Sequence, residues 1–270
     1  MKYLIFGNGY IGNKFKNAFS DAEITETDIG NIDAVRLILE EKKPDIVINC
    51  AGRTGRPNID WCEDHKEETL YSNVTGPFIL AKACFEKSVF MAHLGSGCIY
   101  QGDNNGNGFS EEDVPDINSM PSFYSLTKFV SEYMLDKFPI LQVRLRMPLD
   151  SEKSNRNFIT KITNYEKVIN EPNSMTVIDD LIIATKKLIE KKKTGIYNVT
   201  NPGSITHKEI LDMYKELVDP DFKYQLIDAK SLKTKAGRSN CILSTKKLED
   251  EGIKLPEIHE AMREVLKHYK

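Results

Sequence analysis

The chain has 270 residues, a formal net charge of −3 at pH 7 and a hydrophobic fraction of 40%. This length is sufficient for one large core, alone or with a small satellite unit. The weakly acidic balance offers no electrostatic basis for binding nucleic acid or an anionic membrane surface, and no apolar run is long enough to span a bilayer.

A strand-type apolar run over residues 2–6 opens the chain, and a helical pattern begins near residue 11. Between them lies the glycine motif Gly7-Asn8-Gly9-Tyr10-Ile11-Gly12. In this context Gly7 allows a tight turn, Gly9 lets backbone approach a diphosphate, and Gly12 lets the helix pack closely against the strand. The motif predicts a dinucleotide whose diphosphate lies at the helix N-terminus.

The segment after the second strand, residues 23–30, is short and acidic. Glu26 lies roughly 20 residues past the glycines, where an acidic side chain binds the ribose 2′-hydroxyl of NAD. Asp28 is an alternative contact for the adenine, with Ile29 beside it. This segment favours NADH or mixed use of NADH and NADPH.

Strand-like and helical patterns then alternate along the chain. They comprise a strand over residues 45–52 after a helix ending near residue 43, a helix over 65–87, a strand over 89–94, a helix over 122–137 and a strand over 140–146. This βαβ alternation predicts an α/β fold, with a Rossmann-like, doubly wound parallel sheet over residues 1–147. In such sheets ligands bind at the carboxyl ends of the strands.

Prolines and glycines divide residues 148–270 into shorter elements, with helices expected at about 178–192, 206–217 and 257–269. The pattern is too fragmented to predict an independent core. We therefore expect a small C-terminal substrate-binding subdomain that completes a cleft over the sheet. Segments at about 177–200 are expected to pack back on the N-terminal, NAD(P)-binding domain.

Three residues have the spacing of a carbonyl-reduction site. Ser96 follows the strand over residues 89–94, and Tyr124 and Lys128 are one helical turn apart, so they share a helix face. There the ammonium is expected to lower the pKa of the phenol from about 10. Cys98 would add a second acid/base group. The alternative for Tyr124 and Lys128 is a solvated helix face, and the alternative for Cys98 is a small, buried hydrophobic residue.

The five cysteines, at positions 50, 62, 84, 98 and 241, are odd in number and lack C-x-x-C spacing. They indicate neither a disulfide framework nor a zinc site, and no metal is expected. With no signal peptide ahead of the first strand, we predict a cytoplasmic protein. The oligomeric state stays open, with a homodimer as one option.

The glycine motif, Ser96, Tyr124 and Lys128 together resemble the extended short-chain dehydrogenase/reductase superfamily. More narrowly, the chain resembles the nucleotide-rhamnose synthase/epimerase-reductase family at residues 51–63, 144–148, 156–163, 172–177 and 200–203. The resemblance extends nearly end to end. It implies an NADPH-dependent enzyme that converts a UDP- or dTDP-linked 4-keto-6-deoxy-D-glucose to the L-rhamnose form, by 3,5-epimerisation and then 4-keto reduction.

The same resemblance implies roles for further residues. Cys98 and Lys161 would be the base and acid of epimerisation, with a solvated helix residue as the alternative for Lys161. Further cofactor contacts are implied for Ala51, Gly52, Asn73 and Arg146, in addition to the glycine motif, Asp28, Ile29, Tyr124 and Lys128. Substrate contacts are implied for Arg56, Asn58, Trp61, Asn157, Arg238 and Asn240, with a core anchor as the alternative for Trp61.

Two other functions stay open. A monofunctional dTDP-4-dehydrorhamnose reductase would depend on a separate epimerase, and Cys98 and Lys161 argue against it. A non-catalytic regulatory member of the superfamily would keep the fold alone, which the complete Ser96, Tyr124 and Lys128 set opposes. The sequence leaves open the choice between UDP and dTDP, and the order of epimerisation at C3 and C5.

Overall fold

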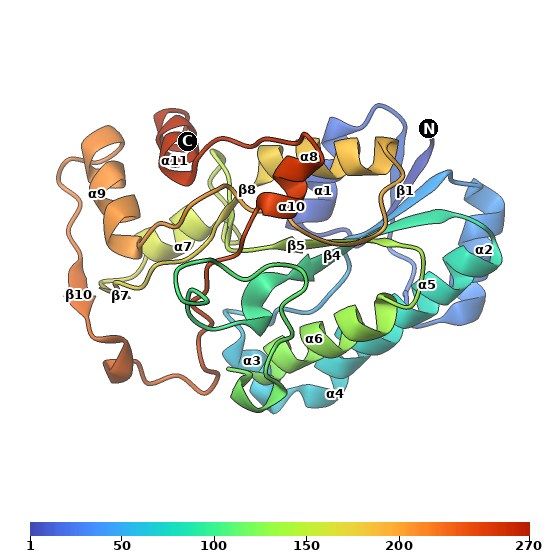
Figure 1. Cartoon of the computed structure of the whole chain (residues 1–270), viewed down its shortest axis with the longest axis horizontal. Helices are drawn as coiled ribbons and strands as arrows, with labels where there is room; N and C mark the ends of the chain where they lie inside the picture. Colours follow the sequence, from blue (N-terminus) through green and yellow to red (C-terminus); the bar gives the residue numbers. More distant parts are fainter.

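A computed structural model describes all 270 residues, and its centre is one parallel sheet (Figure 1). The strand order is β2-β1-β3-β4-β5-β9, and every neighbouring pair is parallel. The strands are β1 (Tyr3–Phe6), β2 (Ala22–Thr25), β3 (Ile46–Asn49), β4 (Phe90–Ser96), β5 (Leu141–Leu145) and β9 (Gly195–Asn198). Because the order reverses between β1 and β3, the predicted doubly wound, Rossmann-like fold is confirmed.

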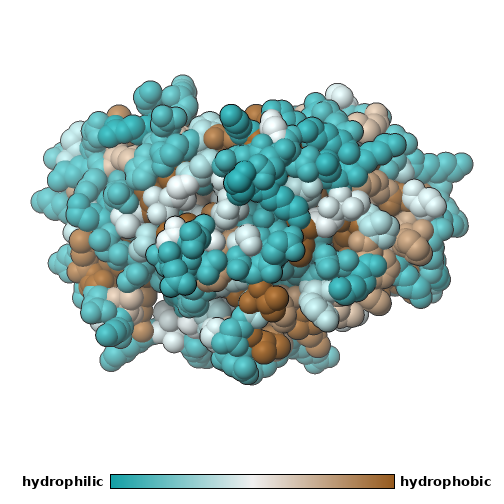
Figure 2. Space-filling view, viewed as in Figure 1, coloured by the Kyte–Doolittle hydropathy of each residue, from teal (hydrophilic) through white to brown (hydrophobic).

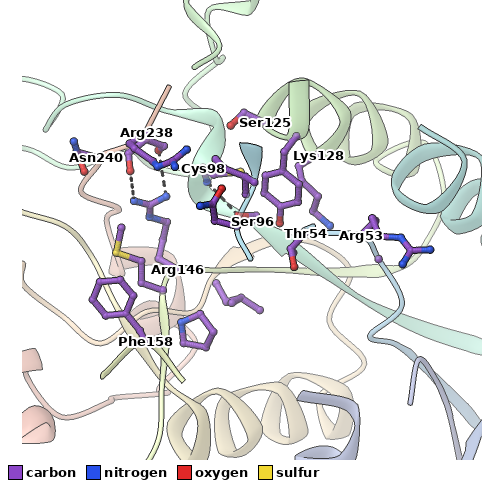
Figure 3. Close-up of a pocket in the computed structure, with 18 of the residues that line it drawn as sticks. Arg53, Thr54, Ser96, Cys98, Ser125, Lys128, Arg146, Phe158, Arg238 and Asn240 are labelled. Carbon is purple, nitrogen blue, oxygen red and sulfur yellow. Dashed lines mark hydrogen bonds between the residues drawn. The ribbon is translucent and has the colours of Figure 1, made fainter. Parts of the chain in front are cut away.

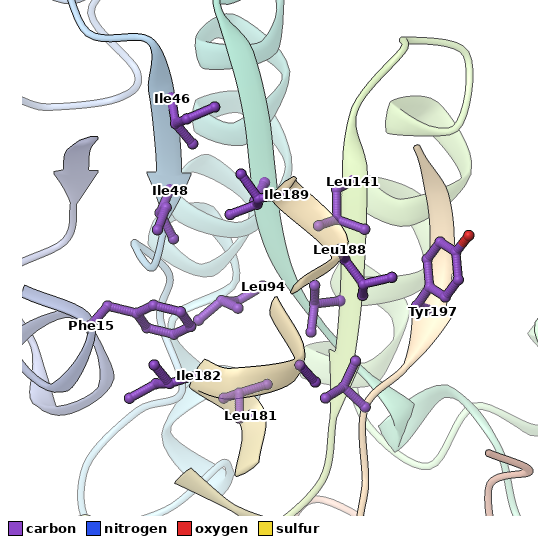
Figure 4. Close-up of a cluster of buried hydrophobic side chains, with 14 of the residues drawn as sticks. Phe15, Ile46, Ile48, Leu94, Leu141, Leu181, Ile182, Leu188, Ile189 and Tyr197 are labelled. Atoms are coloured by element: carbon purple, nitrogen blue, oxygen red, sulfur yellow. The ribbon is translucent and has the colours of Figure 1, made fainter. Parts of the chain in front are cut away.

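Helices cover both faces of this sheet (Figure 1). One face carries α1 (Tyr10–Ala18) and α8 (Ile178–Glu190), and the other carries α2 (Ile32–Lys42), α5 (Gly76–Glu86) and α6 (Phe123–Leu135). Side chains alternate between the faces along each strand, so Ile48 packs with Phe15 and Leu181 while Val47 joins the opposite core (Figure 4). Burial on both faces explains why the strands are continuous apolar runs.

The helix predicted over residues 65–87 is interrupted. It consists of α4 (Lys66–Leu70), a π-helical turn η1 (Tyr71–Thr75) and α5, and the short helix α3 (Asp60–Asp64) precedes it. Pro77 lacks the N–H that would bond the carbonyl of residue 73 in a regular α-helix, which favours a widened turn at this point. The turn places Asn73 in the buried interior, with 1% of its surface exposed.

Residues after 148 form a second, separate core, which corrects the expectation that this part is too fragmented for one. Its elements are β6 (Pro148–Leu149), α7 (Phe158–Thr163), β7 (Lys167–Ile169), β8 (Thr176–Val177), α9 (His207–Leu217), β10 (Gln225–Ile227) and α11 (Ile258–Lys267), here called the C-terminal lobe. Fully buried Ile159, Ile210 and Met262 belong to this core. The apolar faces of short helices and of two small two-stranded sheets pack together and exclude water, although no single element is long.

Several segments from the second half of the chain return to the central sheet. Strand β9 pairs with β5, α8 supplies Leu188 to the sheet core, and α10 (Lys246–Asp250) adds Leu248. Strand β9 is not apparent in the sequence, because it is only four residues long and begins with Gly195. The sixth strand is therefore defined by pairing with β5 rather than by its own pattern.

The surface and the cysteines show no disulfide and no metal site. The face shown in Figure 2 is mostly hydrophilic, with apolar residues in small groups. None of the helices is both long and apolar enough to cross a membrane. All five cysteines are free, and no group of three or more metal-ligating side chains is positioned to hold a metal ion.

A buried ion pair fixes α6 against the sheet. The Arg144 guanidinium donates to both Glu132 carboxylate oxygens at 2.7 Å, and the two side chains are 2% and 7% exposed. Arg144 also donates to the Ser110 carbonyl and to Asn198 Oδ1, both at 3.4 Å. One side chain thus joins α6, β5, β9 and the loop after β4.

Replacing Glu132 with glutamine should lower the free energy of unfolding by about 3–5 kcal/mol, because it leaves Arg144 charged and buried without a counterion. The exposed pair between Arg36 and Glu86 has similar two-pronged geometry, so Glu86→Gln is a matched control that should cost at most about 1 kcal/mol. Urea unfolding followed by circular dichroism measures both. Equal losses for the two variants would show that the buried pair has no special role.

Candidate active site

A cavity of about 610 Å³ lies at the carboxyl ends of β3, β4 and β5, with the C-terminal lobe forming its other wall. Figure 3 shows Ser96, Cys98, Lys128 and Arg146 around it. Tyr124 also lines it. The structure therefore brings together four of the five residues predicted to be catalytic.

The end of β4 presents Ser96 and Cys98 through a local turn. Ser96 Oγ accepts the backbone N–H of Cys98 at 3.3 Å and so caps the 3₁₀ turn η2 (Gly97–Ile99). A side chain at Gly97 would lie 2.9 Å from Arg146 Cδ and 2.6 Å from Leu243 Cδ1. Glycine at this position allows Arg146 to lie directly against the turn that carries Cys98.

Helix α6 delivers Tyr124 and Lys128 from its first turns. Ser122 caps the helix by accepting the Ser125 N–H at 3.0 Å, and Glu63 accepts the next free N–H, from Phe123, at 2.8 Å. Lys128 is 8% exposed, and its Nζ donates to the Leu94 carbonyl at 3.0 Å. Lys128 thus connects the helix to β4.

Burial, rather than Lys128, dominates the titration of Tyr124. Burial raises the pKa of the Tyr124 phenol, and the lowering by Ser96 and Arg146 does not outweigh it. Burial also lowers the pKa of Lys128 itself. The expectation that Lys128 lowers the pKa of Tyr124 below its ordinary value is therefore wrong for this structure, because removing both groups from water favours their neutral forms.

Cys98 is both a cavity residue and part of a small apolar cluster that includes Tyr100 and Cys241. Burial raises the pKa of its thiol above the ordinary value, while Ser96, Arg146, Ser125 and Lys128 act in the opposite direction. The two cations supply the surroundings in which a thiolate is stabilised. The thiol is nevertheless mainly protonated at neutral pH.

The three glycines of the N-terminal motif are used differently. A side chain at Gly12 would lie 2.1 Å from the Gly7 carbonyl oxygen, and one at Gly7, where φ is +103°, would lie 2.6 Å from the Ala51 nitrogen. A side chain at Gly9 would meet nothing within 4 Å. The first and third glycines thus allow close packing, and the second leaves open space above the start of α1, which fits a dinucleotide diphosphate.

The acidic segment after β2 lies beside this motif. Asn8 Nδ2 donates to Glu26 Oε1 at 2.7 Å, and both side chains are exposed. Asp28 accepts from the Tyr71 hydroxyl and from the Gly30 N–H, each at 2.9 Å. Ile29, predicted with Asp28 to bind the cofactor, is a core residue with 6% exposure.

The loop after β3 reaches the cavity and is held by Asn73. Asn73 accepts the Arg53 N–H at 2.7 Å and donates to the Arg53 carbonyl and to Thr127 Oγ1 on α6. Ala51, Gly52 and Asn58 line the cavity from this loop. Ile11 of α1 and Asn73 itself also line it. Opposite them, Arg238 donates to Asp60 Oδ1 at 2.8 Å, which lowers the pKa of Asp60 despite its partial burial.

Arg146 and Asn240 line the same cavity from the side of the C-terminal segment. The Arg146 guanidinium donates to Asn173 Oδ1 at 2.5 Å and to the Ser239 carbonyl at 2.8 Å. It has no carboxylate within ion-pair distance, and its Nε lacks a hydrogen-bond partner. Asn240 Oδ1 accepts from Asn173 Nδ2 at 3.1 Å.

Among the residues predicted to be catalytic or to bind the substrate, four do not line this cavity: Arg56, Trp61, Asn157 and Lys161. Arg56 lies on a neighbouring cavity, and Trp61 stacks on His65 with ring centroids 3.9 Å apart. Lys161 lies on α7, whose residues Phe158 and Ile162 do line it, and burial followed by the charge of Arg156 lowers its pKa.

Asn157 is the clearest disagreement with a substrate-binding role. It is fully buried, its amide donates to the carbonyls of Asp150 and Glu152, and its oxygen caps α7. With its hydrogen-bonding capacity used internally, Asn157 is a loop anchor rather than a substrate ligand.

Sequence reasoning missed some cavity residues, most notably His207. Its ring lies 5.2 Å from that of Phe158, and Nε2 is buried without a hydrogen-bond partner. Burial lowers the pKa of His207 to about 4, so the imidazole is neutral at pH 7. In the sequence, His207 stands alone at the start of a helix, with no neighbouring residues that mark it as part of a site. The apolar lining residues were missed because their sequence pattern is that of an ordinary hydrophobic core; they are Phe158, Ile162, Tyr165 and Val168.

Comparison with known protein families identifies the chain. The model of the RmlD substrate binding domain matches residues 1–270. The chain belongs to this family. A bifunctional dTDP-4-dehydrorhamnose 3,5-epimerase/dTDP-4-dehydrorhamnose reductase of Arabidopsis thaliana is 40% identical over 96% of this chain and 90% of its own length. The predicted superfamily is confirmed, and with it the prediction that the chain is an enzyme.

Two further relatives are similar over nearly the whole chain. The crystal structure of a UDP-rhamnose synthase from Acanthamoeba polyphaga mimivirus has a TM-score of 0.92 and 33% identity, covering 99% of both chains. A trifunctional UDP-glucose 4,6-dehydratase/UDP-4-keto-6-deoxy-D-glucose 3,5-epimerase/UDP-4-keto-L-rhamnose-reductase of Arabidopsis thaliana is 39% identical over 97% of this chain. The chain spans 41% of the length of that larger protein.

Proposed function

We propose that the chain is an NAD(P)H-dependent bifunctional enzyme that epimerises a UDP- or dTDP-linked 4-keto-6-deoxy-D-glucose at C3 and C5 and then reduces C4. The observation that carries this proposal is the convergence of Ser96, Cys98, Tyr124 and Lys128 on one cavity beside a dinucleotide motif. Relatives with this combined activity in their names cover nearly the whole chain. Cys98 adds to the reductase residues the acid/base group that epimerisation requires.

In the reduction, the glycine motif would hold a nicotinamide cofactor, which would supply the hydride for C4. Tyr124 donates its phenolic proton to O4, and Ser96 donates a second hydrogen bond to the same oxygen. Together they stabilise the charge that develops on O4, as in an oxyanion hole. Lys128, whose ammonium donates to the Leu94 carbonyl, would hold the ribose of the bound cofactor.

In the epimerisation, the C4 ketone acidifies the hydrogens on C3 and C5. Cys98, as thiolate, removes such a proton, and Ser96 and Tyr124 hold the resulting enolate oxygen. The family resemblance assigns the return of a proton, from the opposite side of the sugar, to Lys161. Lys161 itself does not line the cavity, but its helix α7 does so through Phe158 and Ile162. Its lowered pKa makes it a better acid near neutral pH. The sugar loses one proton to Cys98 and gains one from Lys161 at each centre, and proton exchange with water returns the thiolate and the ammonium before the next centre reacts.

We further propose that NADH is used at least as well as NADPH. The resemblance implies NADPH, but the carboxylate of Glu26 is bonded to Asn8 next to the glycine motif. An acidic side chain at the end of the second strand accepts from the 2′-hydroxyl of NADH and repels the 2′-phosphate of NADPH. The segment of residues 23–30 contains no basic residue to offset that repulsion.

Replacing Tyr124 with phenylalanine should abolish reduction while leaving solvent exchange at C3 and C5, because Ser96 still supports an enolate. General acid catalysis contributes about 10²–10⁴-fold, so turnover of NAD(P)H should fall by at least a hundredfold. Spectrophotometric turnover and NMR in D₂O measure the two halves separately. Retention of more than about a tenth of the wild-type turnover would remove Tyr124 from the acid role.

Replacing Cys98 with alanine should stop deuterium from entering the sugar at C3, C5 or both. Reduction of a pre-epimerised 4-keto-rhamnose nucleotide should persist, because Ser96, Tyr124 and Lys128 are intact. Lys161→Ala should share the defect, and the double variant should lose little more than either single one. NMR of products formed in D₂O from the UDP and dTDP substrates provides the readout.

Cys241 offers a matched control, because it is fully buried in the same apolar cluster and does not line the cavity. Cys241→Ala removes a thiol that donates to the Gly97 carbonyl at 3.1 Å, so it should lower both activities in parallel. Full deuterium incorporation at both carbons by Cys98→Ala would support a monofunctional reductase instead.

Replacing Glu26 with serine should raise kcat/KM for NADPH relative to NADH by about tenfold, equivalent to roughly 1.4 kcal/mol of differential binding. Steady-state kinetics with each cofactor measure the ratio. Glu23, which lies on β2 and is paired with Lys42 at 2.7 Å, is the control, and Glu23→Gln should leave the ratio unchanged. A wild-type preference for NADPH of more than tenfold would contradict this assignment.

A further inference from the structure

A second cavity, of about 560 Å³, lies beside the glycine motif. Asn8, Gly9 and Tyr10 line one side of it, Arg56 projects from the loop after β3, and Arg156 comes from the segment that leads into α7. None of these five residues lines the large catalytic cavity. The second cavity therefore lies between the dinucleotide motif and two arginines from distant parts of the chain.

The charges of the two arginines are not compensated by the protein. Arg156 donates to Thr54 Oγ1 and to the Gly55 carbonyl, both at 3.2 Å, and neither Arg56 nor Arg156 has a carboxylate within 4.0 Å. Burial, and then the positive charge of Arg56, lowers the pKa of Arg156. Two like charges held close together destabilise the protein unless an anion lies between them.

The other charged groups at this cavity are Lys14, Glu152 and, just outside its lining, Asp150. Lys14 is 2.5 Å from Asp150 and 2.8 Å from Glu152. Because Lys14 balances one of these two carboxylates, the two guanidinium groups leave an excess of one positive charge. Opposite them, Gly9 presents bare backbone, because a side chain there would meet nothing within 4 Å.

We propose that Arg56 and Arg156 clamp the diphosphate of the dinucleotide cofactor against Gly9. This assignment rests on the cofactor of the proposed function. The planar forks of two guanidiniums suit the oxygens of a diphosphate, whose two negative charges balance theirs. Arg56, predicted to contact the substrate, is thereby assigned to the cofactor.

The clamp also connects the two parts of the molecule. Arg56 belongs to the loop after β3, and Arg156 precedes the first helix of the C-terminal lobe. An anion that draws both arginines together holds that lobe against the sheet.

A nucleotide sugar also carries a diphosphate, so the two sources must be separated by experiment. Kd values for NADH, NADPH and ADP-ribose, which keeps the diphosphate but lacks nicotinamide, would be compared with the Kd for UDP. Fluorescence titration and calorimetry suit the full-length wild type, Arg56→Gln and Arg156→Gln. Lys16→Gln is the matched control, because Lys16 is an exposed cation of α1 that lies outside the cavity.

Each arginine variant should raise the Kd for all three cofactor-type ligands by about tenfold or more, because a charge-assisted bond to phosphate is lost. The Kd for UDP should stay within about twofold, and Lys16→Gln should change nothing. Arg156→Lys keeps the charge without the fork and should give an intermediate value. Unfolding curves of the variants confirm that they are folded.

An unchanged cofactor Kd in both arginine variants, with or without weaker UDP binding, would overturn the clamp and leave the proposed function intact. A wild-type protein that binds neither NADH nor NADPH would instead remove the proposed function, and the clamp with it. Weaker binding of UDP and of the cofactor to the same degree would point to general loosening and would also overturn the assignment.

Discussion

The buried ion pair between Arg144 and Glu132 connects the parts of the molecule that form the active site. Glu132 lies one turn beyond Lys128 on α6, and Arg144 lies on β5 beside the strand that ends in Ser96. The aromatic ring of Tyr100, just beyond Cys98, lies 5.2 Å from the Arg144 guanidinium. Because a buried pair requires nearly ideal geometry to offset desolvation, it restricts α6, β5 and this loop to one relative position.

Burial sets the electrostatics of the resulting site. It raises the pKa of the Tyr124 phenol and the Cys98 thiol, and it lowers the pKa of the Lys128 ammonium, so the neutral forms of all three are favoured. The Arg146 side chain lies directly against Gly97. In a site with so little water, a group can ionise only when another charge compensates it, which suits proton transfers between neighbours.

The loop after β3 separates the two cavities and contributes to both. Its first residues, Ala51 and Gly52, line the large cavity, and Arg56 lines the second. Asn73 holds this loop through both backbone groups of Arg53, and the π-helical turn orients Asn73 for that purpose. The π-helical turn thus helps to fix the loop that borders both cavities.

The sequence by itself determined the fold class, because apolar runs and helical periodicity are local and the glycine motif needs only its immediate neighbours. It also determined the hydroxyl, phenol and ammonium set, since Tyr124 and Lys128 share one helix turn. Only the tertiary structure decided what depends on distant segments: the second core, β9, the burial that controls the pKa of Tyr124, and the internal role of Asn157. Arg56 and Arg156 likewise line one cavity although they are 100 positions apart in the sequence, which no local pattern can indicate.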